Sequence, residues 1–257
     1  MSNKSISAII IIIITSFTLT SCNNVTDPYS HENNIKFFEE TTPYSKEENN
    51  EYNYKITNDK LSINSKSNNL NIKKSNTSEI KISMKKIVGG KNEDKLQEAL
   101  NDIQCSYENN TIQIGPIKDD SSIINSNFVE TIINIPESIT SLEIISSVGD
   151  VSLEGDYNNL KVHSNIGDFS YKGILKEGSI DSITGEVKMN LVQLENSYKY
   201  DIDGKIGDIN IKLPKNGSIC LTGAASKKAK IGKEIYVNET GAVFNINKTI
   251  SEVEIDN

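Results

Sequence analysis

The sequence predicts a mainly β protein, a single-stranded β-solenoid of short coils with one short helix in its N-terminal part. Three observations lead to this fold class. A glycine followed by an acidic residue recurs at spacings of 18, 18 and 22 residues, which is the length of a solenoid coil. Apolar and polar residues alternate on both sides of each glycine, as in strands with one buried face. Only 36% of the chain is hydrophobic, which favours a slender core over a thick one.

The repeat places the same residue types at the same offsets in every unit. The glycines are Gly149, Gly167, Gly185 and Gly207, and the acids that follow them are Asp150, Asp168, Glu186 and Asp208. Apolar residues recur five positions before each glycine and two and four positions after it. Each unit therefore predicts two short strands joined at a corner, where glycine supplies a positive φ or the space of a missing Cβ. Because no coil can bury its apolar face alone, the coils must stack on one another.

We expect the solenoid domain to span residues 53–257, with its most regular coils at 137–213. Weaker copies of the repeat surround Asn68 and Ser251, as expected of coils near the ends of a stack. The short helix is expected near residues 92–104. Its apolar face, at helical spacing, consists of Leu96, Ala99, Leu100 and Ile103.

The first 52 residues predict export and membrane anchoring. Residues 1–21 have the charged start and short apolar run of a secretory signal, which is too short to span a bilayer. Leu19-Thr20-Ser21-Cys22 resembles the bacterial lipobox, in which the cysteine is lipidated and becomes the new N-terminus. An ordinary signal peptide with an incidental cysteine is the alternative. Behind a lipidated Cys22, residues 22–52 are expected to form a disordered tether, which places the protein outside the cytoplasm on the outer face of the cell membrane.

The charged residues argue against a nucleic-acid partner. The formal net charge is −8, and all 27 basic residues are lysine. An acidic surface repels a polyanion, and the arginine forks that suit phosphates and base edges are absent from the sequence.

The acidic column Asp150, Asp168, Glu186 and Asp208 has two interpretations. Stacked coils would bring these like charges about one strand spacing apart, which is unfavourable without compensation. A cation such as calcium, held by oxygen ligands, is one form of compensation. The other, which the sequence favours, is a column of solvated turn acids that accept hydrogen bonds from backbone N–H groups. We therefore expect no metal and no cofactor.

Other reactive side chains favour structural roles. Cys105 and Cys220 are far apart in sequence, so a disulfide between them stays open. His31 and His163 lack cysteine or histidine partners at metal-ligand spacing. Serines recur three residues before successive glycines, at Ser146, Ser164 and Ser182. Repetition at one offset indicates a structural ladder, because a nucleophile is single and needs a base.

The Gly-acid units, the Ile133-Asn134-Ile135-Pro136 segment and the short helix between strands together resemble the bacterial putative-adhesin family of uncharacterised β-strand-repeat domains. The resemblance covers roughly residues 53–257. It implies a β-solenoid fold and a surface role, and it brings no catalytic residues. Glu186 in place of Asp, and Asn68, Ser226 and Ser251 in place of Gly, depart from the regular unit.

The function expected from these features is that of a non-catalytic cell-surface lipoprotein with an adhesion, binding or envelope-structural role. Its partners would be the membrane, through the lipid, and a surface protein or glycan. The alternative is an accessory of an envelope-stress or regulatory membrane system. An enzyme acting on polysaccharides is less favoured. The clefts of such enzymes use arginine to bind carboxylates and tryptophan to stack on sugar rings, and this sequence has neither residue.

Overall fold

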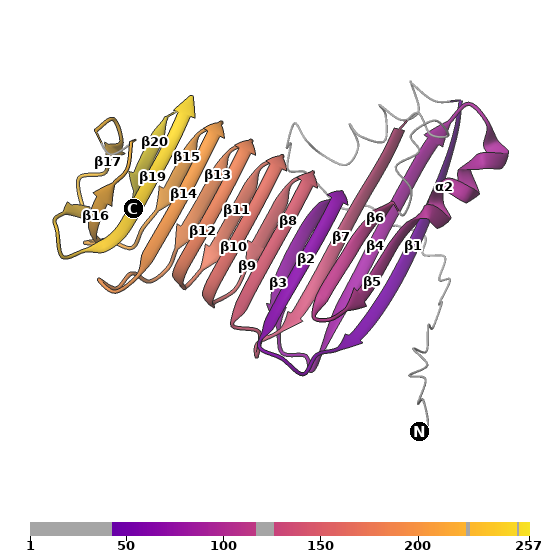
Figure 1. Ribbon diagram of the computed structural model, residues 1–257, viewed down its shortest axis with the longest axis horizontal. Helices are drawn as coiled ribbons and strands as arrows, with labels where there is room; N and C mark the ends of the chain where they lie inside the picture. The colour runs from indigo at the N-terminus through magenta and orange to yellow at the C-terminus, as the bar shows by residue number, and fades with distance from the viewer. Residues whose placement is uncertain (1–42, 117–125, 225–226, 251) are drawn as a thin grey trace, which may run out of the picture.

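A computed structural model describes residues 43–116, 126–224, 227–250 and 252–257. Two ten-stranded sheets lie face to face and enclose one continuous apolar core along the long axis of the molecule (Figure 1). The mainly β, solenoid-like fold is thus confirmed. Cys22, His31, the predicted signal peptide and the tether up to residue 42 lie outside the described residues.

The strands of each sheet follow in their spatial order. The first sheet contains β1 (Tyr44–Lys55), β4 (Glu79–Gly90), β7 (Ser126–Pro136), β3 (Asn69–Ser75), β9 (Val151–Glu154), β11 (Phe169–Gly173), β13 (Val187–Leu191), β15 (Ile209–Lys212), β20 (Val253–Asp256) and β17 (Lys230–Ile231). The second contains β18 (Tyr236–Val237), β16 (Ser218–Thr222), β19 (Ala242–Ile250), β14 (Lys199–Ile206), β12 (Leu175–Thr184), β10 (Tyr157–Ile166), β8 (Ser141–Val148), β2 (Lys60–Ser67), β6 (Thr111–Pro116) and β5 (Ile103–Glu108).

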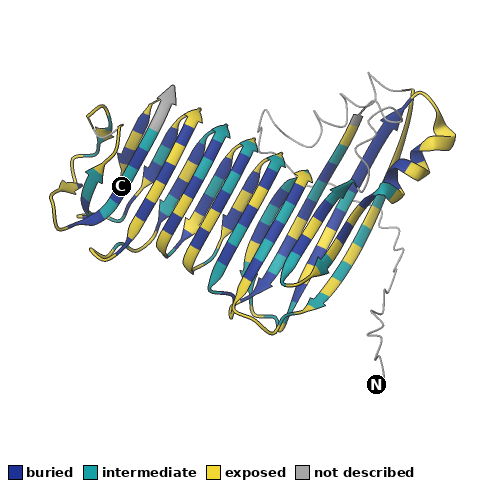
Figure 2. Ribbon diagram, in the orientation of Figure 1, coloured by how far each residue is buried: buried dark blue, intermediate teal, exposed yellow. Residues whose placement is uncertain are grey.

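Each coil contributes one strand to each sheet, and successive coils pair in parallel. In β8, β10, β12 and β14 the residues five before the glycine are aligned and buried, from Ile144 to Ile202. The residues two positions after each glycine, from Val151 to Ile209, are likewise aligned and buried in the first sheet. Figure 2 shows the resulting alternation of buried and exposed residues along the strands. Alternation sends every second side chain inward, so the aligned columns become continuous ladders within the core.

The four repeat glycines form a column at one corner of the stack. Their φ angles lie between +123° and +147°, a region that other residues rarely adopt. Each backbone N–H of the first three is bonded to a carbonyl of the next coil, as in Gly167 to Thr184 at 2.9 Å. A Cβ added at Gly185 would collide with the carbonyl oxygen of Gly167. The corner therefore requires glycine both for its backbone angle and for its contact with the preceding coil.

The coils at both ends of the stack do not follow the order of the sequence. The first coil, β2–β3, lies between β6–β7 and β8–β9, and the last coil, β19–β20, lies between β14–β15 and β16–β17. Both weak copies of the repeat are therefore enclosed by other coils.

The N-terminal end of the stack closes with antiparallel strands. β1 pairs with β4, β4 with β7, and β5 with β6 through Asn109 and Asn110, which both have positive φ. Such a pair of residues suits a two-residue hairpin turn.

The prediction of a tether up to residue 52 is wrong for residues 44–52, which belong to β1. Tyr52 and Tyr54, on one face of β1 near its end, pack against the core. This packing allows β1 to pair with β4 although most residues of the strand are polar.

The predicted helix is shorter than expected. It consists of a 3-10 turn, η1 (Glu93–Lys95), followed by α2 (Leu96–Asp102). Asn92 caps the turn by accepting a hydrogen bond from the backbone N–H of Asp94 at 3.1 Å. Ile103, assigned to the helix by its spacing, instead begins β5 and is buried there. None of the helices in the described parts of the chain could cross a membrane.

The two remaining cysteines are unpaired thiols. Cys105 lies in β5 and Cys220 in β16, near opposite ends of the second sheet. Burial raises the pKa of the Cys105 thiol to about 12, so it stays protonated and unreactive at neutral pH.

We predict that Gly185→Ala lowers the free energy of unfolding by at least about 3 kcal/mol, because it adds both backbone strain and a collision. Gly204→Ala is the matched control, with an expected change within about 1 kcal/mol, because an added Cβ there meets only the side chain of Ile209. Urea denaturation measures both. Equal losses in the two variants would contradict the proposed role of the corner.

Candidate binding surface

The acidic column lies beside the glycine corner and is joined from coil to coil by hydrogen bonds. Oδ1 of Asp150 accepts the backbone N–H of Asp168 at 2.9 Å, and Oδ1 of Asp168 accepts that of Glu186 at 2.8 Å. Asn69 begins this ladder by accepting the N–H of Asp150 at 3.0 Å. Carboxylates bonded to backbone N–H groups offset part of the repulsion between like charges.

Glu186 leaves this pattern, and its side chain instead contacts Lys188 and Asn210. Asp208 resumes the pattern with a bond from the backbone N–H of Glu252 at 2.9 Å. No three His, Cys, Asp or Glu side chains within the described ranges converge closely enough to hold a metal ion. The geometry of the column is that of side chains bonded to the backbone of the next coil.

The recurring serines lie inside the stack. Ser146, Ser164 and Ser182 are aligned with one another on neighbouring strands, and each is at most 1% exposed. Solvent and substrate cannot reach these hydroxyls, which is why they offer no site for nucleophilic chemistry.

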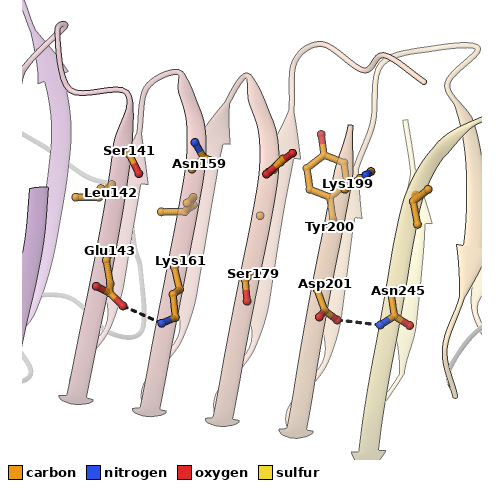
Figure 3. A pocket seen from close by; sticks show the side chains of 14 residues that line it. Ser141, Leu142, Glu143, Asn159, Lys161, Ser179, Lys199, Tyr200, Asp201 and Asn245 are labelled. Atoms are coloured by element: carbon orange, nitrogen blue, oxygen red, sulfur yellow. Dashed lines mark hydrogen bonds and ion pairs between the residues drawn. The ribbon is translucent and has the colours of Figure 1, made fainter. Parts of the chain in front are cut away.

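A groove of about 760 Å³ runs across the outer face of the second sheet, over β8, β10, β12, β14 and β19 (Figure 3). Two rows of outward-pointing side chains line it. The first row contains Ser141, Asn159, Glu177, Lys199 and Val243, and the second contains Glu143, Lys161, Ser179, Asp201 and Asn245. Each row takes one residue from each coil, because neighbouring parallel strands are in register.

Two contacts between neighbouring side chains fix the positions of polar groups in the second row of the groove. Lys161 forms an ion pair with Glu143 at 2.9 Å, and Asn245 donates to Asp201 at 3.0 Å. The ion pair is solvent-exposed and contributes little to stability. Under the groove, the absence of a side chain at Gly178 leaves room for the ring of Tyr200, whose hydroxyl donates to the Leu175 carbonyl at 2.6 Å. The groove is therefore a mixed array of hydroxyl, amide, carboxylate and ammonium groups on a rigid sheet.

His163, a candidate for acid–base chemistry, lies on the same strand as Lys161 of the groove. Its Nδ1 is 2.9 Å from Oδ2 of Asp181 on the next strand. A serine triad also needs a hydroxyl against the other ring nitrogen. No such hydrogen bond is present among the residues that the structure describes, and the neighbouring Ser164 points into the core. The pair is a polar contact between strands.

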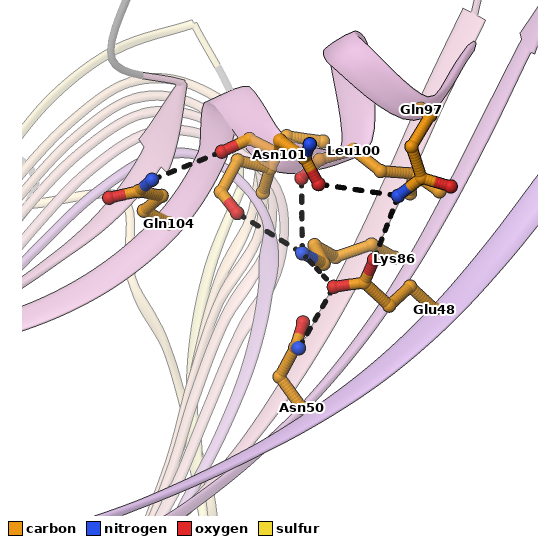
Figure 4. A network of polar contacts seen from close by, with 8 residues as sticks. Glu48, Asn50, Lys86, Gln97, Leu100, Asn101 and Gln104 are labelled. Atoms are coloured by element: carbon orange, nitrogen blue, oxygen red, sulfur yellow. Dashed lines mark hydrogen bonds and ion pairs between the residues drawn. The ribbon is translucent and has the colours of Figure 1, made fainter. Parts of the chain in front are cut away.

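A buried lysine holds the end of α2 against the first sheet (Figure 4). Lys86 is 2% exposed, and its Nζ donates to the carbonyls of Leu100 at 3.0 Å and Ile103 at 3.3 Å. It also pairs with Glu48 of β1 at 2.8 Å. Burial raises the pKa of Glu48. Hydrogen bonds from Lys86, Asn50 and Gln97, with the charge of Lys86, lower it by a larger amount, so the pKa lies below its usual value. The contacts bring an ammonium donor to the Leu100 carbonyl in the last turn of α2, which also accepts the backbone N–H of Ile103, and to the first carbonyl of β5.

Sequence reasoning did not identify either the groove or Lys86. The groove residues are ordinary polar positions of an alternating pattern, and only the register between coils brings them together. Lys86 could have been noticed as the charged residue at an inward position of β4, whose neighbours Met84 and Val88 are buried.

The family model described as Toastrack DUF4097 matches residues 58–227. A solved structure of a putative cell adhesion protein from Clostridium sporogenes ATCC 15579 is 18% identical, with a TM-score of 0.44 over 81% of this chain and 99% of that chain. A putative adhesin from Bacteroides fragilis NCTC 9343 is 11% identical, with a TM-score of 0.36 over 82% and 97%. A putative lipid binding protein from Parabacteroides distasonis ATCC 8503 is 12% identical, with a TM-score of 0.31 over 82% and 94%. No curated protein matches the chain.

We predict that Lys86→Met lowers the free energy of unfolding at neutral pH by about 3 kcal/mol, because a carbonyl of α2, the first carbonyl of β5 and a partly buried carboxylate each lose the ammonium group as a donor. Lys85→Met removes only the exposed pair with Glu47 and should cost about 0–1 kcal/mol. Urea denaturation of both variants provides the comparison.

The ion pair between Lys86 and Glu48 predicts that the free energy of unfolding depends on pH. Because the pKa of folded Glu48 is depressed, its contribution is present above the unfolded pKa of about 4.3 and is lost as the pH falls through the folded value. Lys86→Met should therefore flatten the acid limb of the stability curve, and an unchanged limb would refute the coupling.

Proposed function

The chain belongs to the Toastrack DUF4097 family, and on that premise we propose that it is a non-catalytic binding module held on the outer face of a cell membrane. The observation that carries the proposal is the groove on the second sheet, with its two rows of polar side chains. Parallel strands fix the spacing of these groups, so a ligand meets a preformed surface and little ordering is needed on binding.

The side chains of the groove favour a polar, hydroxyl-rich ligand such as a surface glycan. Hydroxyl, amide and carboxylate groups alternate between adjacent strands at positions where they can exchange hydrogen bonds with sugar hydroxyls. A protein interface would favour a central cluster of aromatic or other large apolar side chains. In the groove the aromatic ring of Tyr200 is buried, and Val243 is the large apolar residue in the outward rows.

The non-catalytic role is supported by what surrounds each candidate group. The acids of the corner are bonded to the backbone, the repeated serines are buried, and the imidazole of His163 faces Asp181. Each of these potentially reactive side chains therefore has a structural role that explains its presence.

The membrane location rests on the N-terminal sequence. The short apolar run followed by Leu19-Thr20-Ser21-Cys22 supports export and lipidation of Cys22. The diacylglyceryl group of such a lipoprotein supplies two acyl chains, and two signals are what stable anchoring needs. The first strand begins at Tyr44, so a segment of about twenty residues would separate the lipid from the sheets.

The groove is tested with an array of purified cell-surface glycans and extracellular proteins. The wild-type chain should retain at least one glycan, and Ser179→Arg should abolish that binding by filling the middle of the groove. Ser106→Arg, on an exposed residue of the edge strand β5, is the matched control and should bind normally. Retention by both variants, or retention of proteins alone, would refute the proposed glycan site. Co-purification with a membrane kinase or anti-sigma factor would favour the alternative regulatory role.

Anchoring is tested by Cys22→Ser in cells. Loss of the lipid site should leave the protein unprocessed or release it from the membrane fraction, as measured by fractionation and metabolic labelling with a fatty acid. A cleaved product that stays in the membrane fraction without label would refute lipid anchoring.

A further inference from the structure

The residues before the repeat glycines form a row on the outside of the corner, and three of the four are apolar. Val148, Ile166 and Ile206 are 46%, 54% and 51% exposed, and Thr184 completes the row between the last two. We call these four residues the corner ridge. They are direct neighbours on adjacent strands, so they form a continuous strip at a spacing of about 4.8 Å.

Packing and backbone geometry do not require apolar side chains on the corner ridge. Ser67 is aligned with Val148, and Thr184 lies within the row itself, so polar side chains fit the same column. The carbonyls of Ile166, Thr184 and Ile206 already accept hydrogen bonds from the glycines of the preceding coil at 2.9 Å. Threonine has the β-branching that strands favour, so strand propensity alone does not call for isoleucine. Val148 and Ile166 are direct neighbours, and Ile206 follows on the far side of Thr184. Exposed apolar side chains gathered in this way favour an interaction site.

The other side of the glycines is acidic and hollowed. Asp150 and Asp168 border a depression of about 390 Å³ on the outer face of the first sheet, together with Asn71, Ser152 and Ser170. Each Asp uses Oδ1 to accept the backbone N–H of the next coil. Lys188 shows that this region accepts an ammonium group, since it pairs with Glu186 at 2.6 Å. That hydrogen bond, together with the charges of Glu186 and Asp168, raises the pKa of Lys188.

We propose that the corner ridge and the adjoining acidic column form a docking surface for an extended protein segment that carries both aliphatic and basic side chains. The aliphatic groups would pack on Val148, Ile166 and Ile206, and the basic groups would reach Asp150, Asp168 and Asp208. Charge complementarity selects this occupant. A second copy of the chain would bring two acidic columns together, and an anionic lipid surface would be repelled. The surface lies on the first sheet and at the corner where β8, β10, β12 and β14 of the second sheet end, and none of its residues lines the groove.

The test uses the full-length chain and a short labelled peptide in which lysine and isoleucine alternate, with binding followed by fluorescence anisotropy. Ile166→Ser combined with Ile206→Ser should weaken binding at least about tenfold, and Val192→Ser should leave it unchanged. Val192 is the matched control because it is 51% exposed at a different place on the chain. Peptides with glutamate in place of lysine, or serine in place of isoleucine, should bind at least tenfold more weakly.

Asp150→Asn combined with Asp208→Asn removes charge without removing the acceptor oxygen, as Asn69 demonstrates in the same column. This variant should fold normally by urea denaturation and should also lose at least about tenfold in affinity, with a reduced salt dependence. Equal peptide binding by the wild type and both double variants would overturn the proposal. Binding to anionic vesicles that depends on Ile166 and Ile206 would also overturn it, in favour of a lipid surface.

Discussion

The close approach of successive coils at the glycine corner is the constraint on which the structure depends. Strand spacing brings the carbonyl of one corner glycine to the place where the next would carry its Cβ. The positive φ of each glycine turns the chain from one sheet to the other at that point. The same turn sets the register, so every inward column and every outward row follows from it. Inward columns become the apolar core, and outward rows become the groove and the corner ridge.

The first and last coils of the repeat do not form the ends of the stack, because each is inserted between two other coils. β20, the last strand of the chain, pairs on both sides, with β15 and with β17. At the other end, the antiparallel strands and α2 cover the core, and Lys86 binds the carbonyls at the end of that helix. Unpaired strand edges promote association with other chains, and charged side chains discourage it. The outermost long strand, β1, carries Lys46, Glu47, Glu48 and Glu51.

The chemistry of the outer surface differs between the two sheets and the corner that joins them. The groove of the second sheet presents a balanced set of polar groups, which suits a ligand held by hydrogen bonds. The corner ridge combines exposed aliphatic groups with a column of carboxylates, which suits a partner with the opposite charge. A rigid stack can hold both surfaces at fixed positions without a change in the fold, because each arises from a different offset of the same repeat. Two surfaces of unlike chemistry are consistent with a module that joins a ligand to a protein partner.

The sequence by itself determined the coil, its corner and its buried columns, because the alternation around Gly149, Gly167, Gly185 and Gly207 is local and repeats at a fixed period. It also pointed to the coils around Asn68 and Ser251 and to the helix, whose last expected residue, Ile103, belongs to a strand. Only the tertiary structure decided the order of the coils, the inclusion of residues 44–52 in β1, and the separation of Cys105 from Cys220. The physical reason is that any coil of this repeat presents nearly the same apolar faces to a neighbour. The choice of neighbour therefore depends on contacts between residues far apart in sequence, as does the meeting of Ser141 and Val243 in one groove.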